Sequence, residues 1–535
     1  MNKIAKFLNQ HIVGNVFTDD AVLEGYATDK SILKIKPKMV VLPECTNDIR
    51  KVLKLANQMA EKGSKLGVTI RGFGNDKTGA AIGDGIVIDL SRRMDKILEI
   101  DIRQRLVRLQ PGVTIGELNT ALALHGMELP VVPRYQGHTI GGMIANNLQG
   151  ETKGGEGTLM DCMRQMEIVL ANGDVLQTER MGKRELHKRK GWQTLEGEIF
   201  RKLDNLIDDR KDVIEELLAG EDMDNVGYEA ISLVRQDHVF DILPLMFASQ
   251  GTLGVVSEVI LEAQFINSET DYLYVEFDNY DRARDVIDAA VALDPSMLNL
   301  CESEIMQVAE STGKVFGAIE RPDGFEPKIA LMIGFSEARR AGAKKVKRLM
   351  KKMPEEGVVA VASSKDSQDD FTQLMGVVET YLNTTSGGQR VPFIDGVYVP
   401  MSFLGEYFGA VKALGKRLKV NMPVYGSVIT GVYNVRPEID FGNLSDRQMM
   451  FKLMSEYAAI VSAMEGSFAG GAPEGRLKSI VVRKDMNEQL EDLYMHIKET
   501  FDPQGVLNPG VKAKIEVRDL VGGLRKDYRE GAIKE

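Results

Sequence analysis

The feature that most constrains the fold of this chain is a run of small residues from Thr139 to Gly150, Thr-Ile-Gly-Gly-Met-Ile-Ala-Asn-Asn-Leu-Gln-Gly. Further glycines follow at positions 154, 155 and 157. Glycine in an ordered segment costs conformational entropy and adds no side-chain packing. Such a density of glycine indicates backbone that approaches a ligand closely, with amide groups turned toward it. A surface loop would explain a single Gly-Gly pair, but two further stretches argue against that reading.

One of these stretches is a glycine turn that follows an apolar strand. Residues 67–70 run into Arg71-Gly-Phe-Gly-Asn-Asp-Lys-Thr78. A Rossmann fingerprint requires a helix directly after its glycines, whereas residues 85–90 alternate like another short strand. A Walker loop also fails, because no Gly-Lys-Ser/Thr closes the run. The turn therefore lies between strands. The other stretch is residues 249–261, where a glycine turn leads into a β-branched strand.

Taken together, the three stretches resemble the FAD-binding domain of the vanillyl-alcohol oxidase superfamily, also called the PCMH-type domain. The similarity extends to residues 41–52, which resemble the family's opening strand and helix, to residues 111–119 and to residues 501–510. The motifs stand in family order over most of the chain, which makes the resemblance specific. It implies an α+β, two-domain PCMH-type FAD-binding fold with a C-terminal α+β cap domain of ferredoxin-like units.

Changes of pattern divide the chain into four parts. With 535 residues the chain exceeds what one hydrophobic core usually spans. We expect an N-terminal lead-in (1–37), the FAD-binding domain (38–265) with a charged helical insertion (192–224), a substrate or cap domain (266–510) and a surface tail (511–535). In the cap domain, strand–helix units are predicted at 271–277 with 280–293, at 328–335 with 336–353, and at 396–400 with 403–419.

The resemblance assigns cofactor contacts residue by residue. The residues concerned are Arg71, Gly72, Gly74, Asn75 and Thr78 for the pyrophosphate, Thr139, Gly141, Gly142 and Asn147 for the flavin and ribityl chain, Gly157, Thr158 and Asp161 in the Gly-Thr-x-x-Asp segment, Gly251 and Val256 for the adenine side, and Asn508 for the isoalloxazine. Asp76, where the family usually has Ser, would repel a pyrophosphate unless its carboxylate points away.

The sequence also bears on how FAD is held. Covalent attachment in this family requires a His or Cys in particular loops. The first loop has Asn75-Asp76 at the position concerned, and residues 131–135 contain no Cys. We therefore expect noncovalent FAD. His138 precedes the Thr-Ile-Gly-Gly segment and is the histidine best placed to touch the cofactor, but a structural role explains it equally well and we assign it none.

Within the superfamily the chain is most similar to the D-2-hydroxy-acid (D-lactate) dehydrogenases and to the FAD-linked subunit of glycolate oxidase. Residues 395–400, 423–426 and 436–437 carry this similarity. It implies oxidation of a hydroxy acid by hydride transfer to flavin N5, assisted by a general base. The family supplies the base and metal ligands in H-x-G-D-G-N-x-H and S-G-E-H-G. Here Ser427 and Asn434 replace the two histidines of the first motif, and Gly471-Ala472 replace Glu-His of the second. We expect no bound metal and a different base.

Candidates for catalysis lie in the equivalent segments. Tyr425, Tyr433 and Glu474 could bind or deprotonate a substrate, and Arg390 could hold a carboxylate bidentately. Core packing or a surface charge accounts equally well for each taken singly. Three functions remain open: an active FAD-dependent oxidoreductase, a partner-dependent electron-transfer subunit, and a noncatalytic FAD-binding scaffold. We favour the first, because the FAD-binding motifs are kept so fully.

Composition excludes several classes of partner. The net charge of −11, with no compensating basic stripe, argues against nonspecific nucleic-acid binding. No run approaches the ~20 apolar residues of a membrane span, and residues 1–10 lack the apolar core of a signal peptide. Cys45, Cys162 and Cys301 lie far apart, which suits a reducing compartment. We expect a cytoplasmic protein, with peripheral membrane association left open, whose partners are a small hydroxy-acid substrate and an electron acceptor of unknown kind.

Overall fold

A small sheet near the N-terminus carries the first glycine turn at its strand ends. The structure is a computed structural model that describes residues 2–131, 133, 135–150, 158–219, 224–266, 269–313, 316–317, 319–337, 341–363, 368–384, 389–484, 486–526 and 528. Strands β2 (Met39–Leu42), β4 (Ile86–Asp89) and β3 (Val68–Arg71) pair in parallel, and β1 (Asn15–Phe17) joins β2 antiparallel. The strands predicted before and after the first glycine turn are confirmed.

Three helices accompany this sheet, namely α1 (Asn2–His11), α2 (Asp20–Gly25) and α3 (Thr46–Glu61). Helix α3 buries Ile49, Val52, Leu53, Ala56 and Ala60, which recur at the spacing of one helical face. These side chains pack with the apolar residues of β2, β3 and β4 in one core. The helix confirms the strand–helix opening expected from residues 41–52.

A five-stranded antiparallel sheet forms the second layer of this half. Its order is β5 (Ile97–Asp101), β6 (Leu106–Leu109), β13 (Val255–Glu262), β8 (Met163–Val169) and β9 (Val175–Gln177). Strand β13 alternates buried and half-buried residues along its whole length, as one-sided burial of a strand requires. The short helices α4 (Ile115–Ala123), α5 (Ile140–Ala145) and α6 (Leu159–Cys162) contribute to the core on its covered face.

The predicted helical insertion is also present. It contains α8 (Leu195–Asp209) and α9 (Lys211–Ala219), preceded by α7 (Lys183–Lys190). Short strands β10 (Met181–Gly182), β12 (Val239–Phe240) and β11 (Arg235–Gln236) form a three-stranded sheet beside them. The 3₁₀ helices η1 (Glu229–Leu233) and η2 (Leu243–Met246) flank β11 and β12 in the chain. Elsewhere in this half, β7 (Met127–Glu128) pairs with β14 (Gln264–Phe265).

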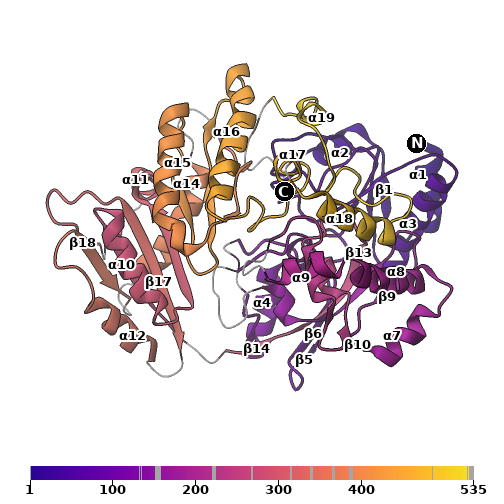
Figure 1. Cartoon of the computed structure of the whole chain (residues 1–535), viewed down its shortest axis with the longest axis horizontal. Helices are drawn as coiled ribbons and strands as arrows, with labels where there is room; N and C mark the ends of the chain where they lie inside the picture. The colour runs from indigo at the N-terminus through magenta and orange to yellow at the C-terminus, as the bar shows by residue number, and fades with distance from the viewer. Residues whose placement is uncertain are drawn as a thin grey trace.

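The second half is built on a seven-stranded antiparallel sheet (Figure 1). Its order is β18 (Val358–Ala362), β15 (Glu269–Phe277), β17 (Ile329–Glu337), β16 (Met297–Glu302), β21 (Val424–Ser427), β22 (Val432–Val435) and β20 (Val397–Tyr398). A two-stranded ladder of β19 (Gln389–Arg390) and β23 (Glu438–Ile439) lies beside it. The α+β class is confirmed for both halves.

Helices cover both faces of this sheet. One core contains α10 (Tyr280–Val291), α12 (Ala341–Met350), α15 (Leu404–Leu418) and α16 (Leu444–Ala463), and another contains α11 (Ser303–Ser311), α13 (Gln368–Met375) and α14 (Val377–Asn383). The expected start of a helix at Ser336 is wrong, because Ser336 and Glu337 still pair in β17 with Thr270 and Glu269. The turn η3 (Met401–Phe403) precedes α15.

The C-terminal segment crosses back to the first half. After α17 (Ser479–Val482), helix α18 (Glu488–Phe501) packs Leu493, Tyr494, Ile497 and Phe501 into the core of the five-stranded sheet, and Figure 1 shows it lying against that half. Residues 506–508 then pair with Val68 of β3. The tail forms the helix α19 (Val517–Val521), which buries Leu520. No helix in the described part of the chain is long and apolar enough to span a bilayer.

Candidate functional site

A cavity of about 420 Å³ lies between the two halves of the molecule. One wall is formed by the glycine-rich segments predicted to bind the cofactor, and the other by the seven-stranded sheet with α14. The substrate-side wall comprises Glu379, Leu382, Asn383, Asp395, Gly396, Tyr425, Gly426, Ser427, Thr430, Val432, Asn434, Arg436, Gly471 and Ala472. Interfaces between domains are among the places where small-molecule sites preferentially occur.

The first glycine turn presents backbone to this cavity. Gly74 has φ +75°, which L side chains rarely adopt, and a Cβ there would overlap the guanidinium of Arg71. A Cβ on Gly72 would lie 2.6 Å from Oγ1 of Thr139, so the first two glycine-rich segments touch here. Arg71 is buried and donates from Nη1 to the carbonyl oxygen of Thr28 at 2.8 Å. These contacts leave no room for a side chain at either glycine, so the turn offers main chain to the cavity, which fits a cofactor held against main chain.

Asp76 closes this turn on itself. Its Oδ1 accepts hydrogen bonds from the backbone N–H of Thr78 at 2.8 Å and of Ala80 at 2.9 Å, and from Oγ1 of Thr78 at 3.0 Å. The side-chain amide of Gln250 also donates to Oγ1 of Thr78, at 3.1 Å. Oδ1 of Asp76 is therefore engaged within the turn. Thr78 in turn links the turn to the 249–256 segment.

The second glycine segment opens helix α5. Oγ1 of Thr139 accepts from the backbone N–H of Gly142 at 3.1 Å, as an N-cap does. The backbone N–H of Gly141 donates to the carbonyl oxygen of Pro111 at 2.8 Å, and a Cβ on Gly141 would approach Cβ of Pro111 to 2.9 Å. Close packing against Pro111 therefore requires glycine at this position.

The structure gathers most of the predicted cofactor residues in one place. Those that line the cavity are Arg71, Gly72, Gly74, Asn75, Thr78, Thr139, Gly141, Gly142, Gly251 and Val256. Their donor-rich turns fit FAD, which they would hold along the cavity. Their individual contacts with FAD stay predictions.

Four predicted cofactor residues lie behind the cavity wall. Asn147 donates from Nδ2 to Oδ1 of Asn225 at 3.0 Å. Thr158 and Asp161 form a capping box at α6. Asn508 donates from Nδ2 to the carbonyl oxygens of Ala80 and Gln250, at 2.9 and 2.7 Å, so it ties two cofactor turns together. Gly157 lies outside the described residues.

His138 lines the cavity next to the ring of Tyr135, with which it makes an edge contact. Burial, together with the charges of Lys77 and Lys30, lowers the pKa of His138 to about 3. The imidazole is therefore neutral at physiological pH and is a poor proton acceptor.

Of the predicted catalytic residues, Tyr425 lines the cavity and three others do not. Tyr433 is buried in the core of the seven-stranded sheet, 5.5 Å from the ring of Tyr407, and burial raises its pKa. Arg390 is buried over the ring of Tyr381 and donates to that residue's carbonyl oxygen at 2.8 Å. The third is Glu474. Catalytic roles for these three residues stay predictions.

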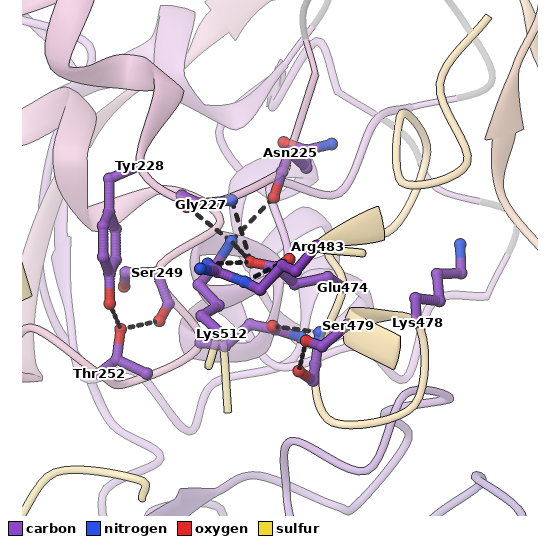
Figure 2. A network of polar contacts seen from close by, with 12 residues as sticks. Asn225, Gly227, Tyr228, Ser249, Thr252, Glu474, Lys478, Ser479, Arg483 and Lys512 are labelled. Carbon is purple, nitrogen blue, oxygen red and sulfur yellow. Dashed lines mark hydrogen bonds and ion pairs between the residues drawn. The ribbon is translucent and has the colours of Figure 1, made fainter. Parts of the chain in front are cut away.

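Glu474 belongs to a buried ionic network drawn in Figure 2. Its Oε1 accepts from Nη2 of Arg483 at 2.8 Å and from the backbone N–H of Gly227 at 3.0 Å, and it lies 3.5 Å from Nζ of Lys512. Lys512 also donates to the carbonyl oxygens of Asn225 and Gly227, at 2.8 and 2.7 Å. Burial alone would raise the pKa of Glu474, but Lys512 and Arg483 hold it below its usual value. The carboxylate is thus ionised and joins three distant segments.

The positions at which the family resemblance implies metal ligands, among them Asn434 and Gly471–Ala472, pack around one turn of the cavity wall that the second half contributes. Oδ1 of Asn434 accepts from the backbone N–H of Gly396 at 3.0 Å, and the backbone N–H of Gly471 donates to the carbonyl oxygen of Gly396 at 3.0 Å. Gly396 has φ +72°, and a Cβ there would lie 3.1 Å from Cβ of Ala472. Among the described residues, no group of three or more His, Cys, Asp or Glu side chains is placed to hold a metal ion.

That turn holds an ionised carboxylate at the cavity wall. Asp395 is 2% exposed, and its Oδ2 accepts from Nε of Arg436 at 2.7 Å and from Nζ of Lys77 at 3.0 Å. Burial would raise the pKa of Asp395, but Arg436 and Lys77 lower it below its usual value. The buried side chain of Lys478 donates to the carbonyl oxygen of Asp395 at 2.6 Å. Sequence reasoning assigned no role to Asp395 or Lys77, although both stand within motifs that it singled out.

Comparison with known proteins gives the same two-part organisation. A family model described as the FAD binding domain matches residues 37–179, and one described as the C-terminal domain of FAD linked oxidases matches residues 266–511. A D-2-hydroxyglutarate dehydrogenase of Pantoea ananatis is 25% identical, over 94% of this chain and 50% of its own length. A D-lactate dehydrogenase of Archaeoglobus fulgidus is 23% identical, over 91% of this chain and 95% of its own.

The chain thus spans about half the length of the D-2-hydroxyglutarate dehydrogenases that it matches. Among solved structures, p-cresol methylhydroxylase with substrate bound superimposes with a TM-score of 0.71 and 15% identity, over 97% of each chain. At that identity the likeness shows the fold alone.

Proposed function

Because this chain belongs to the FAD-linked oxidases and has both of their domains, we propose that it is an FAD-dependent oxidoreductase that oxidises the CH–OH group of a small hydroxy acid without a bound metal. The observation that carries the proposal is the single cavity on which both domains converge. Its one wall has the glycine turns that suit FAD, and its other wall has Asp395, Tyr425, Ser427, Asn434 and Arg436. The names of the two relatives, D-2-hydroxyglutarate dehydrogenase and D-lactate dehydrogenase, both refer to hydroxy acids.

In this proposal one wall of the cavity would bind the cofactor and the other would bind the substrate. Bound FAD would supply a two-electron acceptor for hydride. The turns at Gly72–Gly74 and Gly141–Gly142 would hold the cofactor against main chain. Polar side chains of β21 and β22 would orient the substrate, and the apolar side chains of Leu382 and Val432 in the same wall would limit the entry of water. We place the reaction in the cytoplasm, with a separate acceptor or partner protein removing the electrons.

Anaerobic reduction of the purified protein tests the proposal. The protein should be yellow, should release FAD on heating or acid treatment without covalent attachment, and should be bleached by at least one of a panel of D- and L-2-hydroxy acids. Full activity after treatment with a chelator is expected as well. A colourless, FAD-free protein would contradict the proposal outright. Bleaching by dithionite but by no hydroxy acid would favour an electron-transfer subunit or a scaffold instead.

A further inference from the structure

Asp395 lines the cavity and has one buried carboxylate oxygen without a hydrogen-bond partner among the described residues. Both cationic partners, Arg436 and Lys77, bind its Oδ2, whereas Oδ1 has no hydrogen-bond partner among the residues that the structure describes. A buried acceptor without a partner costs free energy, more so when it carries charge. Ser427 also lines the cavity, and its buried Oγ likewise has no hydrogen-bond partner among the described residues. A bound ligand that donates a hydrogen bond would satisfy such a group.

The turn around Asp395 is held rigidly from its main-chain side. Lys478 donates to the carbonyl oxygen of Asp395, while Asn434 and Gly471 bind the backbone of Gly396. Asn434 stands where the family resemblance implies a histidine, and here it supports the turn that carries Asp395. Preorganisation of this kind is what a catalytic group requires.

The charges at this end suit a monoanion. Arg436 and Lys77 are cationic and Asp395 is anionic, which leaves one net positive charge. The side chain of Lys77 is 33% exposed, and its ammonium group has three donors, of which Asp395 takes one. Lys77 comes from the β3–β4 turn of the FAD-binding domain, so it reaches the substrate side across the interdomain cavity. The other Lys, Arg, Asp and Glu side chains of the lining, which are Lys30, Arg71, Asp76 and Glu379, carry charges that sum to zero.

Tyr425 and His138, which also line the cavity, differ from Asp395 in charge. A tyrosine hydroxyl group ordinarily keeps its proton at neutral pH and donates rather than accepts. His138 is uncharged at neutral pH, so it cannot form the charge-assisted hydrogen bond to a substrate hydroxyl group that an ionised carboxylate can form. Asp395 combines negative charge, a main chain held in place and an oxygen without a hydrogen-bond partner among the described residues.

We propose that Asp395 accepts the hydroxyl proton of the substrate and that Lys77 binds its carboxylate, in place of the histidine site of the related dehydrogenases; this rests on the proposed function. The O–H bond breaks and its proton passes to Oδ1 of Asp395. The carbon–hydrogen bond breaks with its electron pair leaving as hydride, for which bound FAD would be the acceptor. The carbon–oxygen bond becomes double, so the product is a 2-oxo acid. Arg436 acts as a positioning residue for Asp395.

The test separates binding from chemistry with a pair of acids that cannot be oxidised. 2-Hydroxyisobutyrate has the hydroxyl group but no α-hydrogen, and isobutyrate lacks the hydroxyl group. Their dissociation constants are measured from the change that each causes in the flavin spectrum. The wild-type protein should prefer the hydroxylated acid by roughly tenfold, as for one charge-assisted hydrogen bond. Asp395→Asn should lose that preference, whereas Lys77→Met should keep it and bind both acids roughly tenfold more weakly.

Stopped-flow reduction by the hydroxy acid that bleaches the wild-type protein gives the second measurement. Asp395→Asn should slow reduction by about 100-fold or more, the usual contribution of a general base. The matched control is Glu276→Gln, which also removes a buried carboxylate paired with an arginine, Arg321, but does not line the cavity. It should leave the acid preference and the reduction rate unchanged, even if it lowers the melting temperature.

Two outcomes would overturn the proposal while the proposed function stands. One is an Asp395→Asn protein that holds FAD and reduces as fast as the wild type. The other is a wild-type protein that is bleached by a hydroxy acid but does not distinguish the two nonoxidisable acids. A wild-type protein that no hydroxy acid bleaches would instead count against the proposed function itself, and the inference would fall with it.

Discussion

Buried carboxylates differ in whether a cation lies beside them. Asp395 has two cations within 3.0 Å, whereas Asp29 relies on neutral donors: its Oδ1 accepts from the backbone N–H and Oγ of Ser31, at 2.9 and 2.5 Å. Oδ2 of Asp29 has no hydrogen-bond partner among the described residues. Burial, reinforced by the charge of Asp76, raises the pKa of Asp29 to about 7.

This raised pKa predicts a pH-dependent stability. Between the ordinary carboxylate pKa near 4 and about pH 7 the folded protein holds a proton that the unfolded chain has lost, so stability falls as pH rises through this window. Asp29→Asn removes the effect. It should raise the free energy of unfolding at pH 8 by on the order of 2 kcal/mol and have little effect at pH 4. Urea unfolding of both proteins at the two pH values checks this, and an equal difference at both would contradict it.

At the scale of the element, the β3–β4 turn depends on a glycine in the left-handed region. Gly74→Ala would force a Cβ against Arg71 at φ +75°. Because the turn must then shift where it faces the cavity, we expect FAD binding to weaken by about tenfold or more. Fluorescence titration of the deflavinated protein with FAD measures this.

Gly63→Ala is the matched control for this change. Gly63 has φ +78°, and its Cβ would meet no atom within 4 Å. It lies just after α3 and does not line the cavity. The substitution carries the same backbone strain, of about 1 kcal/mol, and should leave FAD affinity as it is. Equal loss of FAD in both variants would show that strain alone, and not the cradle, accounts for the effect.

At the scale of the whole molecule, the network of Figure 2 joins segments far apart in the sequence. Glu474 and Arg483 belong to the C-terminal part, whereas Gly227 belongs to the first half, and Lys512 returns from beyond α18. Glu474→Gln leaves buried Lys512 without its ion-pair partner and leaves Arg483 with Glu491 alone. It should lower the free energy of unfolding by about 3–5 kcal/mol, measured in denaturant.

Glu258→Gln provides the comparison for this substitution. Glu258 pairs with Arg108, whose side chain is 48% exposed, on the surface of the five-stranded sheet. Its loss should cost about 1 kcal/mol or less, because exposed ion pairs are screened by water. Similar losses in both variants would mean that the buried network does not hold the molecule together.

Local patterns predicted the individual elements well. Alternation and helical spacing located β3, β4, β15, α10 and α15 close to their observed bounds, because each depends on residues near in sequence. The helix expected from residue 336 began too early, because pairing with β15 extends β17 by two residues. Such pairing depends on a partner more than 60 residues away.

The sequence by itself determined the cofactor domain, since closely spaced glycines report a local need for exposed backbone. It also determined the loss of the histidine motifs. Only the tertiary structure decided which polar residues meet at the cavity. Lys77, Asp395 and Arg436 lie in three separate segments, and their approach depends on how the two domains pack. The same packing placed Glu474 and Arg390 in buried contacts away from the cavity, because a charged side chain there is stabilised by partners that no local pattern reveals.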